Sequence, residues 1–190
     1  MEELMEPVRL VSGKVSVLDR ADVDTDQIIP KQFLKRIERT GYGEFLFYDW
    51  VRSGEVTVEA NPILAAGRNF GCGSSREHAV WAIQQFGFGA VVAPSFGDIF
   101  YGNCTKNGLL PVLLPEADVR ALMAAGEATI DLAAQTVSFA GRSVPFEIDA
   151  DIKHRLLNGL DEIGLTMQYE AEISAFERDR LPAGPVTTAL

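Results

Sequence analysis

The strongest constraint on the fold is the alternation of short apolar runs and helix-forming stretches in the middle of the chain. Ile63 to Ala66 and Ala90 to Ala93 are apolar runs of strand length. Between them, Glu77 to Phe86 has helical periodicity and is followed by Gly87 and Gly89, which favour a helix end. A strand, a helix and a strand in this order form a βαβ unit, so we expect parallel strands in this region.

The rest of the chain extends this pattern. Val8 to Leu18 alternates apolar and polar residues and predicts an early strand, and Gln32 to Trp50 predicts a short helix followed by a loop. The other predicted strands are Leu109 to Leu114, Ala128 to Leu132, Thr136 to Phe139 and Ser143 to Ile148. The other predicted helices are Phe96 to Asn103, with Gly108 as a cap, Glu116 to Ala125, Ala150 to Asn158 and Thr166 to Arg178. The sequence therefore predicts an α/β fold with a mixed sheet, as one domain over residues 1–182 with a disordered tail at 183–190.

Composition limits the function. The 190 residues carry a net charge of -10, which argues against a nucleic-acid surface. An acidic N-terminus and the lack of any run of about 20 apolar residues argue against a leader or membrane span, so we expect a cytoplasmic protein. The two cysteines, Cys72 and Cys104, are too few for a disulfide framework and have the wrong spacing for a metal knuckle.

The most informative motif is the stretch Gly-Cys-Gly-Ser-Ser-Arg-Glu-His-Ala at residues 71–79. Ser74 and Glu77 have the spacing of a capping box, which predicts a helix N-terminus beneath the serines. The N–H groups of such a terminus attract anions, and Arg76 adds a planar fork that matches a carboxylate. The motif therefore predicts an anion site. The alternative is that Ser74 only caps the helix and Arg76 is a solvated residue of its first turn.

A second motif is an upstream loop with three aspartates at alternate positions, Asp22, Asp24 and Asp26. Their spacing suggests an EF-hand calcium loop, but Gln27 stands where that loop needs glycine, and Phe33 where it needs a bidentate glutamate. Calcium binding is therefore not expected. For Asp22 and Asp24, an acidic turn that caps the next helix remains an alternative to a functional role.

Both motifs resemble the swivelling domain of the aconitase superfamily, and the likeness to small subunits of the 3-isopropylmalate dehydratase family covers almost the whole chain. Further matching stretches are Pro30 to Leu34 with Arg39 to Gly41, Ala93 to Asn103, and Asn158 to Thr166. The resemblance implies a single swivelling β/β/α-type domain, similar to the aconitase C-terminal domain. It also implies a hydro-lyase that isomerises 2-isopropylmalate to 3-isopropylmalate through isopropylmaleate, in leucine biosynthesis.

The resemblance also implies roles for individual residues. Ser74 would remove a proton beside a substrate carboxylate, Arg76 would bind a carboxylate, and the backbone around Ser75 would support both. Thr25 and Asp26 would line the site or support it. The candidate specificity segment is Gln32, Phe33, Leu34, Arg36, Arg39 and Thr40. Single-chain aconitases place another carboxylate-binding arginine shortly after the aspartate motif, and neither Arg36 nor Arg39 falls cleanly on that position.

A partner is implied as well. The family's 4Fe–4S cluster belongs to a large subunit, which would form a heterodimer with this chain, because two cysteines cannot hold such a cluster. We expect no metal on this chain and no catalytic role for His78, His154 or Cys72. The rival interpretations are a related heteromeric hydro-lyase acting on homoaconitate, citraconate or dimethylmaleate, or a binding module that senses a carboxylate without turning it over.

Overall fold

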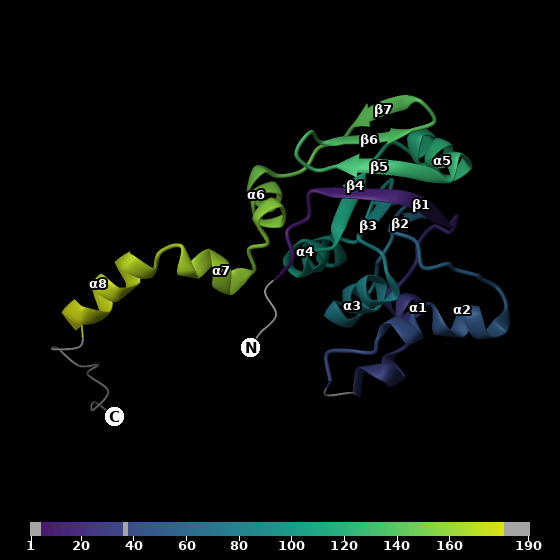
Figure 1. The fold of residues 1–190 in the computed structure, drawn as a ribbon. Helices are drawn as coiled ribbons and strands as arrows, with labels where there is room; N and C mark the ends of the chain where they lie inside the picture. The colour runs from purple at the N-terminus through teal and green to yellow at the C-terminus, as the bar shows by residue number, and fades with distance from the viewer. Residues whose placement is uncertain (1–4, 36–37, 181–190) are drawn as a thin grey trace.

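The computed structural model describes residues 5–35 and 38–180 of the chain. Seven strands form one sheet in the order β4-β3-β2-β1-β5-β6-β7 (Figure 1). Strands β1 to β4 pair in parallel, whereas β5, β6 and β7 join through antiparallel pairs. The predicted mixed sheet is confirmed. The strands are β1 (Leu10–Leu18), β2 (Ile63–Ala66), β3 (Ala90–Ala93), β4 (Leu110–Leu113), β5 (Glu127–Asp131), β6 (Thr136–Phe139) and β7 (Arg142–Pro145).

Helices cover both faces of this sheet and extend beyond it. The predicted βαβ unit is confirmed as β2, α3 and β3. The α-helices are α1 (Thr25–Ile28), α2 (Tyr48–Ser53), α3 (Glu77–Phe86), α4 (Asp98–Asn107), α5 (Glu116–Ala125), α6 (Ala150–Asn158), α7 (Glu162–Met167) and α8 (Glu170–Arg180). Two 3-10 helices are η1 (Lys31–Lys35) and η2 (Gly43–Phe45). No helix in residues 5–35 and 38–180 is long and apolar enough to cross a membrane.

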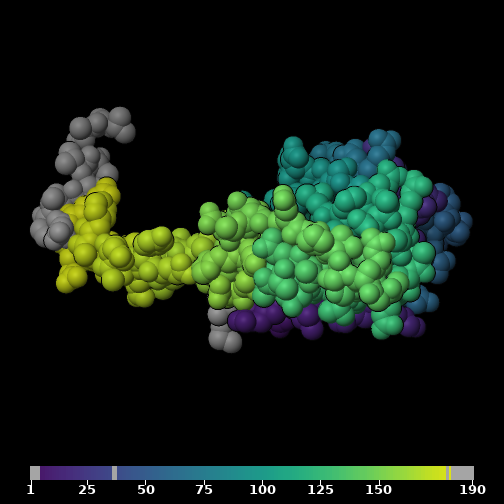
Figure 2. Space-filling view, turned by 90° about the horizontal axis from the view of Figure 1, so that it is seen from above, coloured from purple at the N-terminus to yellow at the C-terminus, as the bar shows by residue number. Residues whose placement is uncertain are grey.

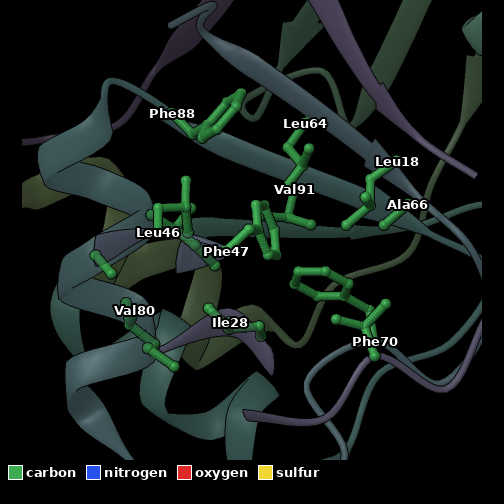
Figure 3. Close-up of a cluster of buried hydrophobic side chains, with 14 of the residues drawn as sticks. Leu18, Ile28, Leu46, Phe47, Leu64, Ala66, Phe70, Val80, Phe88 and Val91 are labelled. Atoms are coloured by element: carbon green, nitrogen blue, oxygen red, sulfur yellow. The ribbon is translucent and has the colours of Figure 1, made fainter. Parts of the chain in front are cut away.

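Alternation along the central strands creates two hydrophobic cores. In β2, Leu64 and Ala66 point to one face of the sheet, and Ile63 and Ala65 point to the other. Residues of α1, α3 and α4 complete the first core, and residues of α5 and α6 complete the second. Figure 3 shows the first core, in which aromatic side chains such as Phe47 fill the space between strands and helices. The sheet is thus buried on both faces where its strands are parallel.

The segment after η1 differs from its predicted form. A loop was expected through the aromatic residues before Trp50, but the chain forms η2 and then α2. Phe47 is fully buried, and its ring stacks on Trp50 at a centroid distance of 5.9 Å. The Arg20 guanidinium lies 4.5 Å from the centroid of the Trp50 ring. Burial of these rings against the first core orders the segment into helical turns.

The C-terminal region also differs from prediction. One helix was expected from Thr166 to Arg178, but the structure has two, separated by a turn at Gln168 and Tyr169. The first begins earlier, because the Asp161 side chain accepts a hydrogen bond from the Gly164 N–H (2.6 Å) and caps it. Both helices project away from the sheet, as Figures 1 and 2 show. The predicted tail at 183–190 lies outside the described residues.

Candidate active site

The two sequence motifs meet where the loops after β1, β2 and β3 leave the parallel part of the sheet. The Thr25 N–H donates to the Cys72 carbonyl oxygen at 2.9 Å, which joins the first loop to the second. The Phe70 N–H donates to the Ser95 carbonyl oxygen at 3.0 Å and joins the second loop to the third. The carboxyl ends of parallel strands share one edge of a sheet, which is the usual position of a binding site in α/β proteins.

The aspartate loop is held in shape by its own side chains. Asp24 is the N-cap of α1 and accepts a hydrogen bond from the Asp26 N–H at 2.7 Å, while Gln27 accepts from the Asp24 N–H at 2.9 Å. This reciprocal capping box confirms a helix-capping turn for Asp24. An aspartate followed three residues later by a glutamine is a sequence signal for this cap.

Gly73 allows the aspartate loop and the serine loop to touch. Its φ angle is +91°, which side-chain-bearing residues rarely adopt, and a Cβ at this position would overlap the Asp24 carboxylate. Thr25, which is almost fully buried, donates from its hydroxyl to the Ser74 carbonyl oxygen at 2.8 Å. The aspartate loop therefore fixes the backbone that carries the candidate catalytic serine.

Ser74 does not cap α3, so the predicted capping box with Glu77 is wrong. The N-cap is Arg76, whose backbone is extended (φ -147°, ψ 108°) and whose side chain makes no capping bond. This extended residue separates the serines from the helix, and Ser74 and Ser75 lie exposed ahead of it. The structure thus contradicts the alternative in which the Ser74 hydroxyl is only a helix cap.

Arg76 forms a two-pronged ion pair with Asp26. Nη1 donates to Oδ1, and Nη2 donates to Oδ2 at 2.9 Å. The Arg76 side chain is only 12% exposed, so it is not a solvated first-turn residue. The hydrogen bond from Arg76 lowers the pKa of the Asp26 carboxyl against the opposing effect of its burial, and Lys31 adds to the lowering. Asp26 is therefore a carboxylate that holds the arginine in place.

Cys72 and His78, the other candidate reactive side chains of the motif, are both held in their neutral forms. Burial raises the pKa of the Cys72 thiol, and the nearby charges of Asp24 and Asp22 raise it further, so this cysteine is not a nucleophilic thiolate. Burial lowers the pKa of His78, whose ring contacts Tyr42 at a centroid distance of 5.1 Å. That neither side chain acts in catalysis remains a prediction.

The candidate specificity segment starts beside the Asp26 carboxylate, and its other end lies against α3. Lys31, the residue before the segment, contributes a backbone hydrogen bond that lowers the pKa of Asp26. Phe33 stacks on Phe45 with ring centroids 4.0 Å apart, and the Arg39 guanidinium lies 5.8 Å from the centroid of the Trp81 ring. Gln32 and Thr40 are exposed and Leu34 is half-buried, while Arg36 lies outside the described residues.

The donor set of this chain does not fit an iron–sulfur cluster. Among the residues that the structure describes, no three or more His, Cys, Asp or Glu side chains gather where they could hold a metal ion. Cys104 is fully buried in the first core, and burial raises its thiol pKa well above the ordinary value. An iron–sulfur cluster takes four ligands, mostly thiolates. Cys72 and Cys104 are separate from each other and do not supply them.

Comparison with known proteins defines the class of this domain. Residues 55–117, which include β2, the serine motif, α3, β3 and β4, match the family model of the aconitase C-terminal domain. Residues 162–185 match the model of the C-terminal domain of 3-isopropylmalate dehydratase small subunits. Three of the parallel strands, the serine loop and the arginine that follows it therefore lie in the part of the chain that matches an aconitase-type C-terminal domain.

Full-length relatives narrow this class. A 3-isopropylmalate dehydratase small subunit from Halalkalibacterium halodurans is 54% identical over 93% of this chain and 100% of its own length. One from Rubrobacter xylanophilus is also 54% identical, over 93% of this chain and 96% of its own length. A solved 3-isopropylmalate dehydratase structure from Methanocaldococcus jannaschii superposes with a TM-score of 0.71 at 27% identity, covering 87% of this chain and 98% of that one. The chain belongs to the family of 3-isopropylmalate dehydratase small subunits.

Proposed function

We propose that Ser74 and Arg76 are this chain's contribution to a hydro-lyase active site whose remaining groups lie on a large subunit. The family assigns the chain as the small subunit of 3-isopropylmalate dehydratase, in leucine biosynthesis. That enzyme moves a hydroxyl group between neighbouring carbons, from 2-isopropylmalate to 3-isopropylmalate, by dehydration and rehydration. The observation that supports the proposal most is the contact between the two loops, which presents an exposed serine beside a positioned arginine.

Ser74 would take the proton in dehydration and return one in rehydration. A serine hydroxyl is a weak base unless its alkoxide is stabilised, and the start of α3 provides two stabilising features. The first N–H groups of a helix lack partners within it and carry partial positive charge. The Arg76 guanidinium on the same short segment is paired with the Asp26 carboxylate, so it adds hydrogen-bond dipoles rather than a full charge. The Thr25 bond to the Ser74 carbonyl oxygen keeps this segment in one conformation.

Arg76 would bind a substrate carboxylate with the guanidinium N–H donors that are not bonded to Asp26. Asp26 contacts the two terminal nitrogens, Nη1 and Nη2. A guanidinium has five N–H donors in a planar fork, so the edge that includes Nε remains for a second, bidentate partner. Two carboxylates on one arginine would thus have different roles, one fixing the side chain and one belonging to the substrate.

The partner would be a large subunit that carries the 4Fe–4S cluster, since two separated cysteines do not supply the ligands for it. The name "small subunit" of the relatives supports a larger partner. We place the complex in the cytoplasm, the reduced compartment that two free cysteines favour. The ligand would be a small dicarboxylate rather than a nucleic acid, since the net charge is -10.

The experiment that tests this proposal is reconstitution of the chain with a 3-isopropylmalate dehydratase large subunit under anaerobic conditions. We expect Ser74→Ala to assemble normally but to lower turnover of 2-isopropylmalate about 10²- to 10⁴-fold, the range for losing a positioned base. Ser138→Ala on β6, which removes an exposed hydroxyl bonded to Ser143, should keep wild-type turnover. Near-normal turnover in Ser74→Ala would remove this residue from the chemistry. A binding module that only senses carboxylates would give no turnover with any large subunit.

A further inference from the structure

One side chain of α3 holds the far end of the specificity segment. Gln85 Oε1 accepts a hydrogen bond from the Tyr42 N–H at 2.8 Å, and Gln85 Nε2 donates to the Arg39 carbonyl oxygen at 2.7 Å. A single planar amide thus bridges the two ends of the turn from Arg39 to Tyr42. The chain then passes directly over the end of the helix, because a Cβ on Gly43 would lie 2.7 Å from the Gln85 carbonyl carbon.

These contacts belong to one face of the helix that follows Arg76. His78, Trp81 and Gln85 are spaced by three and four residues, so their side chains lie in one row along α3. Tyr42 is fully buried, and its ring lies 5.1 Å from the His78 ring and 5.8 Å from the Trp81 ring. The far end of the segment and the carboxylate-binding arginine are therefore attached to the same ten-residue helix.

The near end of the segment is held in a different way. Phe33 stacks on Phe45 with an interplanar angle of 11°, and meets the edge of Tyr48 at a centroid distance of 4.9 Å. Phe45 and Tyr48 follow the segment in the sequence, so the chain closes on itself through apolar contact. Directional hydrogen bonding to the helix is supplied at the far end by the Gln85 amide.

We propose that Gln85 is a positioning residue for substrate specificity in the dehydratase. It fixes the far end of the Gln32 to Thr40 segment at a set distance from Arg76 without touching the substrate. One carboxylate of the substrate is then bound at Arg76, and the alkyl group that distinguishes one malate from another faces the end of the segment that Gln85 fixes. This inference rests on the proposed function, in which that segment discriminates between substrates.

The first test measures how often the backbone from Arg39 to Tyr42 separates from Gln85 in the full-length chain. Gln85→Glu keeps the size and the acceptor of the side chain but loses the donor to the Arg39 carbonyl oxygen, and places a carboxylate against it. Gln84→Glu is the matched control, because Gln84 Nε2 donates to the Asn107 carbonyl oxygen of α4 at 2.7 Å instead. Trypsin cleaves after arginine, so cleavage after Arg39 reports on the backbone that Gln85 holds, and cleavage through local opening follows the population of the open form.

We expect cleavage after Arg39 to be about tenfold faster in Gln85→Glu, as the loss of one net hydrogen bond predicts. Gln84→Glu should be cleaved at the wild-type rate. Equal rates in the two variants would overturn the inference, provided that both have wild-type thermal midpoints. Gln85 is exposed, so neither core is disturbed by its replacement.

The second test measures specificity in the complex with the large subunit. Gln85→Glu should raise KM for 2-isopropylmalate about tenfold and change kcat less than about threefold, because uniform binding is weakened and the chemical groups remain. Its preference for 2-isopropylmalate over 2-ethylmalate should fall several-fold. Wild-type KM and preference would show that Gln85 has only a structural role.

Leu34→Ala separates this inference from the proposed function on which it rests. Leu34 lies within the segment, whereas the Gln85 amide bonds to the backbone of Arg39 and Tyr42. A changed preference in Leu34→Ala with none in Gln85→Glu would overturn the role of Gln85 and keep the segment's role. An unchanged preference in both variants would overturn both. In either case the effect of Ser74→Ala on turnover is measured independently.

Discussion

At the scale of single residues, the ion pair of Arg76 and Asp26 decides how the site behaves. The arginine is mostly buried, but 47% of the Asp26 side chain is exposed, so solvent screens the attraction and its contribution to stability is small. Because the folded pKa of Asp26 is lowered, the pair stabilises the fold above the unfolded pKa of about 3.9 and loses this effect as pH falls through the folded value. Asp26 therefore stays ionised between about pH 6 and 8, and its titration should not change the activity in this range.

Charge and shape at Arg76 can be separated by comparing Arg76→Lys with Arg76→Ala in the reconstituted complex. Lysine keeps the positive charge but loses the planar fork, so it cannot bind Asp26 and a substrate carboxylate on separate edges. We expect kcat/KM to fall in both variants. The fall in Arg76→Ala should be about 30- to several-thousand-fold, from about 2–5 kcal/mol for truncating one member of a buried charge pair.

The control for this comparison is Arg120→Lys on α5. Arg120 pairs with Glu116 on the surface and is 72% exposed, so its replacement should leave the kinetics unchanged. The specificity constant is measured at matched subunit and cluster occupancy. Wild-type values for both Arg76 variants would refute a carboxylate-binding role.

The residue types of the site could be predicted from the sequence, but their pairing could not. Ser74 and Arg76 stand in a nine-residue motif, whereas the Arg76 partner, Asp26, is 50 positions away and becomes a neighbour only through the sheet. The capping box at Ser74 and Glu77 failed because its spacing does not determine where the helix begins. The extended backbone of Arg76 moved the N-cap by two residues. Local spacing, in contrast, would have predicted the real capping box at Asp24 and Gln27.

At the scale of elements, the site depends on the fit between two loops that follow neighbouring parallel strands. The loop after β1 and the loop after β2 are joined by the Thr25 bonds to Cys72 and Ser74, and Gly73 lies at their point of closest approach. These strands pair in register from Val15 with Ile63 onward, so the loops leave the sheet side by side. A change in this contact should affect catalysis as well as stability.

Gly73→Ala tests this fit. Its Cβ would overlap the Asp24 carboxylate, and a φ of +91° strains any residue with a side chain. Gly126→Ala is the matched control, because Gly126 also has a positive φ (+71°) but would place its Cβ in open space. We expect both variants to lose about 1–3 kcal/mol of unfolding free energy in urea, and only Gly73→Ala to lose turnover as well. Equal turnover in the two would mean that the loop contact is not needed for activity.

Elements with strong local patterns could be predicted from the sequence. The helix Glu77–Phe86 and the strands on each side of it have the predicted bounds, because apolar periodicity and flanking glycines act locally. The helix Tyr48–Ser53 was missed, because it is stabilised by aromatic rings that pack on distant parts of the core. Tertiary packing, not local propensity, orders that segment.

At the scale of the whole molecule, the chain has a compact sheet and a projecting arm formed by α7 and α8 (Figure 2). Several apolar side chains of the arm are exposed, among them Met167, Tyr169 and Phe176. A chain that ends at Gln168 should therefore lose little burial relative to one that ends at Arg180. We expect its thermal midpoint, followed by circular dichroism, to stay within about 3 °C of the chain that ends at Arg180, a shift of less than about 1 kcal/mol. A larger fall would mean that α8 stabilises the sheet.

The division of labour between subunits is tested by the colour and activity of the purified chain. Thiolates are the ligands of an iron–sulfur cluster, but Cys104 is fully buried and the pKa of each thiol is raised. After anaerobic incubation with iron and sulfide, we expect no visible absorption from a bound cluster and no turnover of 2-isopropylmalate.

Addition of a cluster-loaded large subunit should then produce turnover, and the activity should saturate as this chain is added to a fixed amount of the partner. If the isolated chain retains iron, this iron is either adventitious or part of a stoichiometric cluster. The variant Cys72→Ser distinguishes the two cases. If bound iron is adventitious, the variant retains as much as the wild type and, with the partner, its turnover stays within about threefold. A stoichiometric cluster on the isolated chain, lost in Cys72→Ser and accompanied by turnover without the partner, would contradict the proposed division, because the chain would then contain the complete active site.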